Sequence, residues 1–312
     1  MTRKLKIAAA QLGPIQRSDT RSDATRRLVE LLREAHAVGA RFVVFPELAF
    51  TTFFPRWWLD AQDEVDRLYF EEAMPSAETM PLFDEARRLS VGFSIGYAEK
   101  VVDANGEIRR FNTSILVSPD GRIAGKYRKI HLPGHAEYKP DAPFQHLEKK
   151  YFEVGDLGFR VWQYMNAAVG MLICNDRRWP EAFRVLALKG AELVTLGYNT
   201  PAENLHYAEP EPLRVHHHLI MAQAMAYQNA TWLVETAKCG REDGFRMFGH
   251  SLIVAPTGEI VAKTLTEEDE VASFDCDLDM AANLKRTMFD FARHRRPEHY
   301  GLLVQPSANT SP

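Results

Sequence analysis

Cysteine is scarce in this chain of 312 residues. The three cysteines, Cys174, Cys239 and Cys276, are odd in number, widely spaced and form no C-x-x-C pair. A disulfide framework is therefore not expected, and this cysteine usage is typical of a reducing compartment. We expect a cytoplasmic protein.

Long apolar runs and an excess of one charge are also missing. No window approaches the ~20 apolar residues that a membrane helix needs, and Gln11 interrupts the short N-terminal run, which predicts a first strand. The 38 Lys and Arg residues nearly balance the 42 Asp and Glu residues, giving a formal net charge of −4. Such a balance lacks the electrostatic footprint of a nucleic-acid-binding protein. We expect neither a membrane nor nucleic acid as a partner.

Several well-known site motifs do not occur. The sequence has no G-x-S-x-G, P-loop, G-x-G-x-x-G or H-E-x-x-H motif. His216-His217-His218 is the one tempting metal cluster. Three adjacent residues of a helix point in different directions, so a shared metal site is not expected there.

The chain does have ample core material and a regular order of elements. A hydrophobic content of 46% excludes low-hydrophobicity disorder. Strand-like and helix-like patterns alternate, with a loop at 200–212 and no obvious linker, which predicts an α/β layered fold with mixed sheets. We predict one domain over 1–304 and a polar tail at 305–312. The expected strands cover 6–10, 41–45, 92–99, 167–173, 191–196, 231–236, 251–255 and 271–276, and the expected helices cover 24–35, 80–89, 179–189 and 213–229.

Two segments of the chain resemble each other. In both 117–126 and 254–263 an apolar run meets Pro-x-Gly, and a second alternating run follows. This order is typical of a β-hairpin. We interpret the pair as a hairpin repeated in two halves of one sheet system. The alternative is that Pro-x-Gly turns are simply common.

Three reactive side chains share one local pattern, an apolar strand that ends in a functional group. They are Glu47 in VVFPEL, Lys129 in GKYRKIHLPG and Cys174 in GMLICNDRRWP. Strand ends present side chains into a crevice from a rigid backbone. The sequence therefore suggests one shared site for a carboxylate, an ammonium group and a thiol.

Each of the three also has an ordinary structural interpretation. A buried cysteine is usually inert, but the polar residues and the expected helix start after Cys174 favour its thiolate. A partly desolvated Glu47 would have a raised pKa suited to proton transfer, whereas an exposed loop glutamate would not. Lys129 lies in a basic cluster that is also typical of a solvated strand, although an ammonium beside a thiolate would stabilise an oxyanion.

The segments FPE (45–47), YRKIHLPG (127–134) and CNDRRWPE (174–181) resemble the Glu, Lys and Cys motifs of the nitrilase superfamily of carbon–nitrogen hydrolases. Further segments are similar to the D-carbamoylase group of that superfamily, from Ile7 to about Leu302. The loops 202–214 and 237–248 depart from it and leave the side-chain preference open. The similar segments are ELAFTTFFPRW (47–57), RFNTSILV (110–117), PFQHLEKKYFEVGDLGF (143–159), GYNTP (197–201), GHSLIVAPTGEIVA (249–262) and EHYGL (298–302).

The resemblance implies a four-layer α-β-β-α sandwich with two mixed β-sheets. It implies Glu47 as general base, Lys129 as oxyanion stabiliser, Cys174 as nucleophile and Glu148 as a supporting carboxylate. The expected substrate-binding residues are His146, Asn175, Arg177, Arg178, Asn199 and Thr200, of which the two arginines would hold a carboxylate.

The resemblance also implies a reaction. The expected reaction is hydrolysis of N-carbamoyl-D-amino acids to the D-amino acid, CO2 and ammonia through a covalent thiol-bound intermediate. The alternative is a β-ureidopropionase-like or aliphatic amide hydrolase that uses the same residues. No metal or organic cofactor is expected, and the partners are a small N-carbamoyl amino acid and further copies of the chain in a homodimer or homotetramer.

Overall fold

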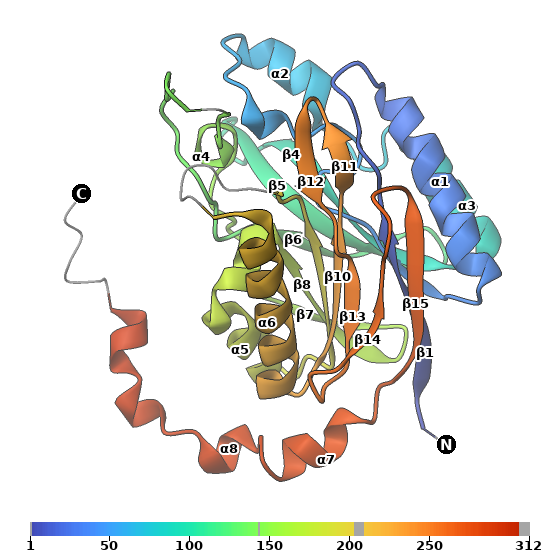
Figure 1. Ribbon diagram of the computed structural model, residues 1–312, viewed down its shortest axis with the longest axis vertical. Helices are drawn as coiled ribbons and strands as arrows, with labels where there is room; N and C mark the ends of the chain where they lie inside the picture. The colour runs from blue at the N-terminus through green and yellow to red at the C-terminus, as the bar shows by residue number, and fades with distance from the viewer. Residues whose placement is uncertain (1, 143, 203–208, 306–312) are drawn as a thin grey trace.

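Two β-sheets form the centre of the molecule (Figure 1). The computed structural model describes residues 2–142, 144–202 and 209–305. The first sheet has the strand order β15-β1-β2-β4-β5-β6, with β3 also paired to β4. Its strands are β1 (Lys4–Gln11), β2 (Phe42–Val44), β3 (Phe70–Glu71), β4 (Gly92–Val102), β5 (Ile108–Val117), β6 (Ile123–Arg128) and β15 (Glu270–Asp277).

The second sheet has the order β14-β13-β10-β9-β8-β7, and β11 and β12 form a separate hairpin. In both sheets the central strands pair in parallel and the outer ones antiparallel, so both are mixed as the sequence predicts. The strands are β7 (Val161–Tyr164), β8 (Ala167–Ile173), β9 (Leu193–Tyr198), β10 (Trp232–Ala237), β11 (Cys239–Glu242), β12 (Phe245–Phe248), β13 (Leu252–Val254) and β14 (Ile260–Lys263).

Alternating side chains divide the interior into layers. In β1, Ile7 and Ala9 pack toward the second sheet, whereas Ala8 and Ala10 pack under helices α1 (Arg21–Ala37) and α3 (Met80–Leu89). This is the period of two that a strand imposes. Helices α5 (Pro180–Leu188) and α6 (Glu211–Asn229) cover the second sheet on its outer side (Figure 1). The predicted four-layer α-β-β-α sandwich is confirmed.

The repeated hairpin is also confirmed, with one copy at an edge of each sheet. β5 and β6 form the first copy, and β13 and β14 form the second. Gly121 and Gly258 occupy the left-handed region at φ +78° and +87°, which glycine adopts without steric cost. Their N–H groups donate to the carbonyls of Ser118 and Ala255, both at 2.8 Å. The register shifts by one residue at the same point of each hairpin.

The start of α6 differs from the sequence prediction. The expected loop over 200–212 is partly wrong, because α6 already begins at Glu211 and uses Pro212 in its first turn. Residues 203–208 of that loop, and all of the tail after Gln305, lie outside the described residues.

The remaining helices are short. They are α2 (Gln62–Tyr69), α4 (Glu148–Tyr151), α7 (Ala281–Arg286) and α8 (Phe291–His294), with 3₁₀ turns at η1 (Phe54–Arg56), η2 (Cys174–Arg178), η3 (Pro297–His299) and η4 (Gly301–Val304).

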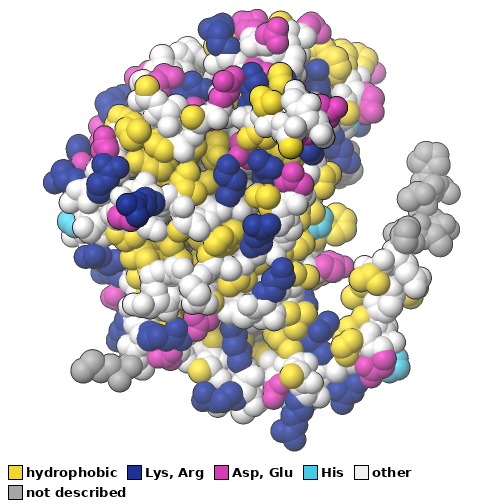
Figure 2. Space-filling view, turned by 180° about the vertical axis from the view of Figure 1, so that it is seen from behind, with side chains coloured by type: hydrophobic (Ala, Val, Ile, Leu, Met, Phe, Trp, Pro, Cys, Tyr) yellow, Lys and Arg dark blue, Asp and Glu magenta, His cyan; other side chains and the backbone are white. Residues whose placement is uncertain are grey.

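The C-terminal segment contacts the body of the molecule through α7, where Lys285 Nζ donates to the Ala191 carbonyl at 2.7 Å, and through α8, where the Arg184 guanidinium lies 4.2 Å from the centre of the Phe291 ring. The chain then extends away from the body through η3 and η4 (Figures 1 and 2). It exposes Leu302, Leu303 and Val304, which are between 64% and 86% accessible. Exposed apolar side chains of this kind are typical of a contact between subunits. They support the expected homodimer or homotetramer, which stays a prediction. Across the described residues, none of the helices combines the length and apolar character needed to cross a bilayer.

Candidate active site

The three predicted strand exits meet between the two sheets. Glu47 lies three residues after Val44, the last residue of β2, while Lys129 directly follows β6 and Cys174 directly follows β8. Lys129 Nζ donates to Glu47 Oε1 at 2.8 Å and to Glu148 Oε2 at 2.5 Å. One carboxylate oxygen each of Glu47 and Glu148 and the sulfur of Cys174 lie within 4.8 Å of one another. The structure therefore places an acid, an amine and a thiol around one point.

Glu47 is fully buried, so it is not the exposed loop residue of the alternative interpretation. Its Oε1 accepts from Asn112 Nδ2 at 2.7 Å, and its Oε2 accepts from the Asn199 N–H at 3.1 Å. Burial raises the pKa of Glu47, and the attraction of Lys129 only partly opposes that increase. A carboxyl group with a raised pKa can accept and return a proton.

Lys129 is likewise fully buried between two carboxylates. Burial opposes its charge, but attraction from Cys174, Glu148 and Glu47 outweighs burial and raises the pKa of Lys129. Burial acts against the charge of Glu148 as well, but Lys129 reverses this effect and lowers the Glu148 pKa. The ammonium group is therefore the cation of this cluster, and a metal ion between the two carboxylates would have to displace it.

Cys174 differs from the sequence prediction in its ionisation. Burial, followed by repulsion from Glu47, raises its pKa to about 11, and the attraction of Lys129 and Arg177 does not compensate. The helix start expected to favour a thiolate is only the 3₁₀ turn η2, and Cys174 is its first residue; α5 begins at Pro180. The predicted thiolate is therefore wrong for the free protein, whose Cys174 is a thiol beside a carboxylate.

This raised pKa predicts a steep pH dependence of alkylation. Since only the thiolate reacts, the rate of Cys174 modification by iodoacetamide should rise about tenfold per pH unit between pH 7 and 10. Glu47→Gln should increase the rate at pH 7, because Glu47 raises the thiol pKa. The measurement is peptide mass spectrometry after timed alkylation. A rate that is already constant below pH 8 would show a thiolate at neutral pH.

Asp176 fixes the chain just after the thiol. Its Oδ2 accepts from Tyr127 OH at 2.8 Å and from the Ile173 N–H at 2.9 Å, and its Oδ1 contacts His131 Nδ1 at 2.7 Å. Cys174 itself has φ +47°, a conformation that a non-glycine residue keeps only when its surroundings hold it. The strand exit is therefore rigid at the residue that carries the sulfur.

Two glycines allow Glu47 to lie between the sheets. A Cβ on Gly96 of β4 would come 2.7 Å from the Cα of Glu47, and a Cβ on Gly197 of β9 would come 2.5 Å from its backbone nitrogen. The two strands belong to different sheets. The backbone at Pro46 and Glu47 is thus held from both sides, and no larger side chain fits.

Gly197→Ala should consequently move the Glu47 carboxyl. We expect a loss of about 1–3 kcal/mol of unfolding free energy from overpacking. We expect a fall of about 10- to 100-fold in turnover, since misplacing a catalytic group by about 1 Å can cost that much. Urea unfolding and steady-state rates measure both effects. Gly301→Ala, where the nearest atom lies 4.0 Å away, is the control, and equal behaviour of the two variants would contradict the argument.

A cavity of about 840 Å³ opens above the thiol. Of the predicted substrate-binding residues, His146, Asn175, Arg178, Asn199 and Thr200 line it together with Cys174. Arg177 lies behind this wall, with Nη2 donating to Thr200 Oγ1 at 2.7 Å and its guanidinium 4.4 Å from the centre of the Tyr198 ring. The structure therefore brings all of the predicted residues together. Of the two arginines only Arg178 lines the cavity that contains Cys174, whereas both border a smaller adjoining hollow.

Arg178 is the exposed arginine. Its Nη1 donates to Asn175 Oδ1 at 3.0 Å, which is the one hydrogen bond of this guanidinium among the described residues, and the side chain lines the cavity. The surrounding protein and the nearby Arg177 lower the pKa of Arg178 to about 10, so it stays charged at neutral pH.

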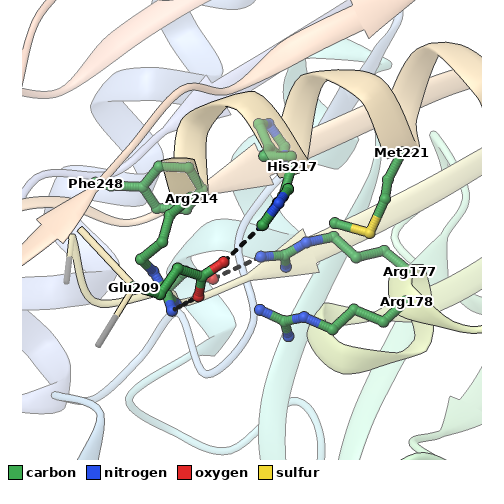
Figure 3. Close-up of a pocket in the computed structure, with 9 residues that line it drawn as sticks. Arg177, Arg178, Glu209, Arg214, His217, Met221 and Phe248 are labelled. Carbon is green, nitrogen blue, oxygen red and sulfur yellow. Dashed lines mark hydrogen bonds and ion pairs between the residues drawn. The ribbon is translucent and has the colours of Figure 1, made fainter. Parts of the chain in front are cut away.

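Sequence reasoning missed several residues of the site. Asn112 binds Glu47, and Asp176 fixes the thiol turn, although neither belongs to a recognisable motif alone. Glu209, Arg214 and His217 form another part of the cavity wall (Figure 3). Only the departure of the loop 202–214 from the D-carbamoylase pattern pointed there. The histidine run gives no metal site, because His217 faces Glu209 while His218 is buried near Tyr198.

A four-layer sandwich with a Glu–Lys–Cys cluster between its sheets defines a carbon–nitrogen hydrolase of the nitrilase superfamily. The chain belongs to the carbon-nitrogen hydrolase family, whose profile matches residues 6–286.

Named relatives extend over nearly the whole chain. A nitrilase of Pyrococcus abyssi is 32% identical over 95% of this chain and 99% of its own. An N-carbamoylputrescine amidase of Arabidopsis thaliana is 31% identical over 98% of this chain and 97% of its own. The crystal structure of a carbon-nitrogen hydrolase from Helicobacter pylori G27 superposes with a TM-score of 0.80 at 25% identity, over 97% of this chain and 99% of that one.

Proposed function

We propose that this protein hydrolyses N-carbamoyl-D-amino acids, R-CH(COO⁻)-NH-CO-NH₂, to the D-amino acid, CO2 and ammonia. The observation that carries the proposal is Arg178, which exposes its guanidinium in the same cavity as Cys174. A guanidinium binds a carboxylate through two parallel hydrogen bonds and so fixes both its distance and its orientation. Hydrolysis of a carbamoyl group agrees with the family, while the carboxylate-bearing substrate rests on this arginine.

The ureido carbonyl is a poor electrophile because two nitrogens donate electrons into it. In the proposed mechanism the Cys174 thiol transfers its proton to Glu47 as the sulfur attacks the carbonyl carbon. Lys129 Nζ stabilises the oxyanion that forms. The buried carboxylate of Glu47 suits this role, since its raised pKa lets it hold the proton until the leaving group needs it.

The proton on Glu47 then passes to the terminal nitrogen, the carbon–nitrogen bond breaks and ammonia leaves. A thiocarbamate remains on Cys174. Glu47, again a carboxylate, takes a proton from water as the water attacks, and the sulfur–carbon bond breaks with return of the proton to Cys174. The N-carboxy amino acid released loses CO2 to give the free amino acid. Glu148 holds Lys129 between the two carboxylates throughout.

The D configuration is supported by the similarity of several segments to the D-carbamoylase group. The deciding experiment is ammonia release from matched D- and L-N-carbamoyl-phenylalanine, with Cys174→Ala as control. β-Ureidopropionate, N-carbamoylputrescine and propionamide represent the alternative activities. Turnover of the D-carbamoyl amino acid well above all the others supports the proposal. Preference for β-ureidopropionate or a simple amide would overturn it.

Arg178→Lys should weaken substrate binding more than chemistry. A lysine keeps the charge but offers no planar pair of N–H groups, so we expect KM to rise about tenfold with a smaller change in kcat. Arg160→Lys, an exposed arginine outside the cavity lining, is the matched control. An unchanged KM in Arg178→Lys would place the carboxylate elsewhere in the cavity.

A further inference from the structure

The wall of the cavity holds a third arginine that the proposed mechanism does not use. Arg214 lies on α6, and its guanidinium, like those of Arg177 and Arg178, borders the same hollow (Figure 3). It is 6% exposed, and it also lines the larger cavity that contains Cys174.

The hydrogen bonding of Arg214 is incomplete. Among the described residues, Nη1 donates to Glu209 Oε2 at 2.7 Å, while the buried Nε–H has no partner. A guanidinium carries five N–H donors, and a buried donor without an acceptor is unfavourable. Burial lowers the pKa of Arg214, with Glu209 opposing and Arg177 contributing to this decrease. A further carboxylate beside Arg214 would satisfy the free donor and offset the repulsion from Arg177.

Glu209 shows how a carboxylate fits at this position. Its Oε2 accepts from Arg214, and its Oε1 lies 2.6 Å from His217 Nδ1. The carboxylate thus bridges two cavity residues from the side opposite Arg177 and Arg178 (Figure 3). The Glu209 carboxylate makes the contacts that a bound carboxylate ligand would make here, but it belongs to the chain itself.

The charges of this wall do not balance. Among the described residues that line this hollow, three carry a guanidinium group and Glu209 carries the one carboxylate, while the buried Glu235 attracts Arg177 from outside the lining. The α-carboxylate of a carbamoyl amino acid accounts for one of the three guanidinium groups, at Arg178. Arg177 and Arg214 each keep a buried Nε–H without a partner among the described residues, but only Arg214 also lines the larger cavity that contains Cys174.

We infer that Arg214 is a specificity-determining residue that binds an acidic side chain of the substrate, so that the preferred substrates are N-carbamoyl derivatives of acidic amino acids. This inference rests on the proposed function. Glu209 occupies part of the guanidinium in the free protein and yields to, or shares it with, the side-chain carboxylate of the substrate. The competing interpretation is that the Arg214–Glu209 pair only fastens the chain at residue 209 to α6.

The test compares acids with their neutral isosteres, in the enantiomer that the protein turns over. The pairs are N-carbamoyl-aspartate with N-carbamoyl-asparagine, and N-carbamoyl-glutamate with N-carbamoyl-glutamine. We expect the acidic member of at least one pair to have a kcat/KM about tenfold or more above its amide. Arg214→Met should bring that ratio to about one, and Arg214→Lys should restore part of it. Arg26→Met, on the exposed face of α1, is the control that should leave the ratio unchanged.

Glu209→Gln gives a second variant in which Arg214 is retained. Removing the internal carboxylate frees the guanidinium, so the acid-to-amide ratio should rise above that of the wild type. An unchanged ratio in Arg214→Met overturns the inference, and if that variant does not fold, an unchanged ratio in Glu209→Gln does so.

Failure of the proposed function can be separated from failure of this inference. Calorimetric titration of Cys174→Ala with N-carbamoyl-aspartate and N-carbamoyl-asparagine measures binding without turnover. Binding of both with equal affinity overturns the role of Arg214 and leaves the proposed function standing. Binding of neither, together with ammonia release by the wild type from N-carbamoyl-D-phenylalanine, overturns only the role of Arg214. Binding of neither without that ammonia release overturns the proposed function as well.

Discussion

Cys174→Ala should reduce ammonia release at least about 10⁴-fold, the scale of loss when a nucleophile that acts together with a base is removed. The sulfur forms the bond to the carbonyl carbon in the proposed mechanism, and no neighbouring group can replace it. Substrate binding should persist, because Arg178 and the rest of the cavity wall do not depend on the thiol. Steady-state rates and calorimetric titration measure the two properties separately.

The chain provides matched controls for this variant. Cys239 and Cys276 are also buried and unpaired, and burial raises both of their pKa values. In the described chain neither cysteine hydrogen-bonds to Glu47 or Lys129. Cys239 donates to the Leu12 and Glu268 carbonyls, and Cys276 donates to the Phe274 carbonyl. Alanine at either position should leave turnover within a few-fold of the wild type. More than about one per cent residual activity in Cys174→Ala would remove this residue as the nucleophile.

Lys129→Met should damage both stability and activity. The variant keeps Glu47 and Glu148 fully buried but removes their shared cation, and breaking a buried pair in this way costs about 3–5 kcal/mol. Turnover should fall at least about 10²- to 10³-fold, since the charge that stabilises the oxyanion is lost. Urea unfolding and steady-state rates give the two numbers.

The stability deficit of Lys129→Met should depend on pH with a defined sign. Without the ammonium, burial raises the pKa of both carboxyl groups above their unfolded values. A group with a raised folded pKa favours folding below its unfolded pKa and loses that contribution as pH rises through the folded value. The deficit should therefore be large at pH 8 and shrink toward pH 5.

Lys126→Met is the matched control, because Lys126 lies on β6, the strand that Lys129 directly follows, and pairs with Glu99 at a more accessible position. It should lose no more than about 1 kcal/mol, as partly exposed pairs do. A Lys129→Met variant as stable as this control, at every pH, would contradict the buried ion-pair arrangement.

Local sequence patterns were sufficient for most of the elements. The apolar period of α1 and the alternation in β1 are set by residues only a few positions apart, so they can be read without tertiary information. The two Pro-x-Gly hairpins follow from turn chemistry that is local as well. The prediction of a loop over 200–212 is partly wrong, because Pro212 is common in turns but also suits the first turn of a helix, where the negative charge of Glu211 is favourable as well.

The sequence by itself determined which side chains end the strands: Glu47, Lys129 and Cys174 each follow an apolar run, and the family resemblance linked them. Only the tertiary structure decided their states. Residues as far apart as Asn112 and Asn199 bind the Glu47 carboxylate. The burial of Cys174 in the same site raises its pKa and keeps it a thiol, where the local sequence suggested a thiolate. Ionisation depends on desolvation and on charges brought together by folding, and neither is a property of neighbours in the chain. Arg214 depends on the fold in the same way, because only the tertiary structure places Arg177, Arg178 and Glu209 around the hollow that it lines.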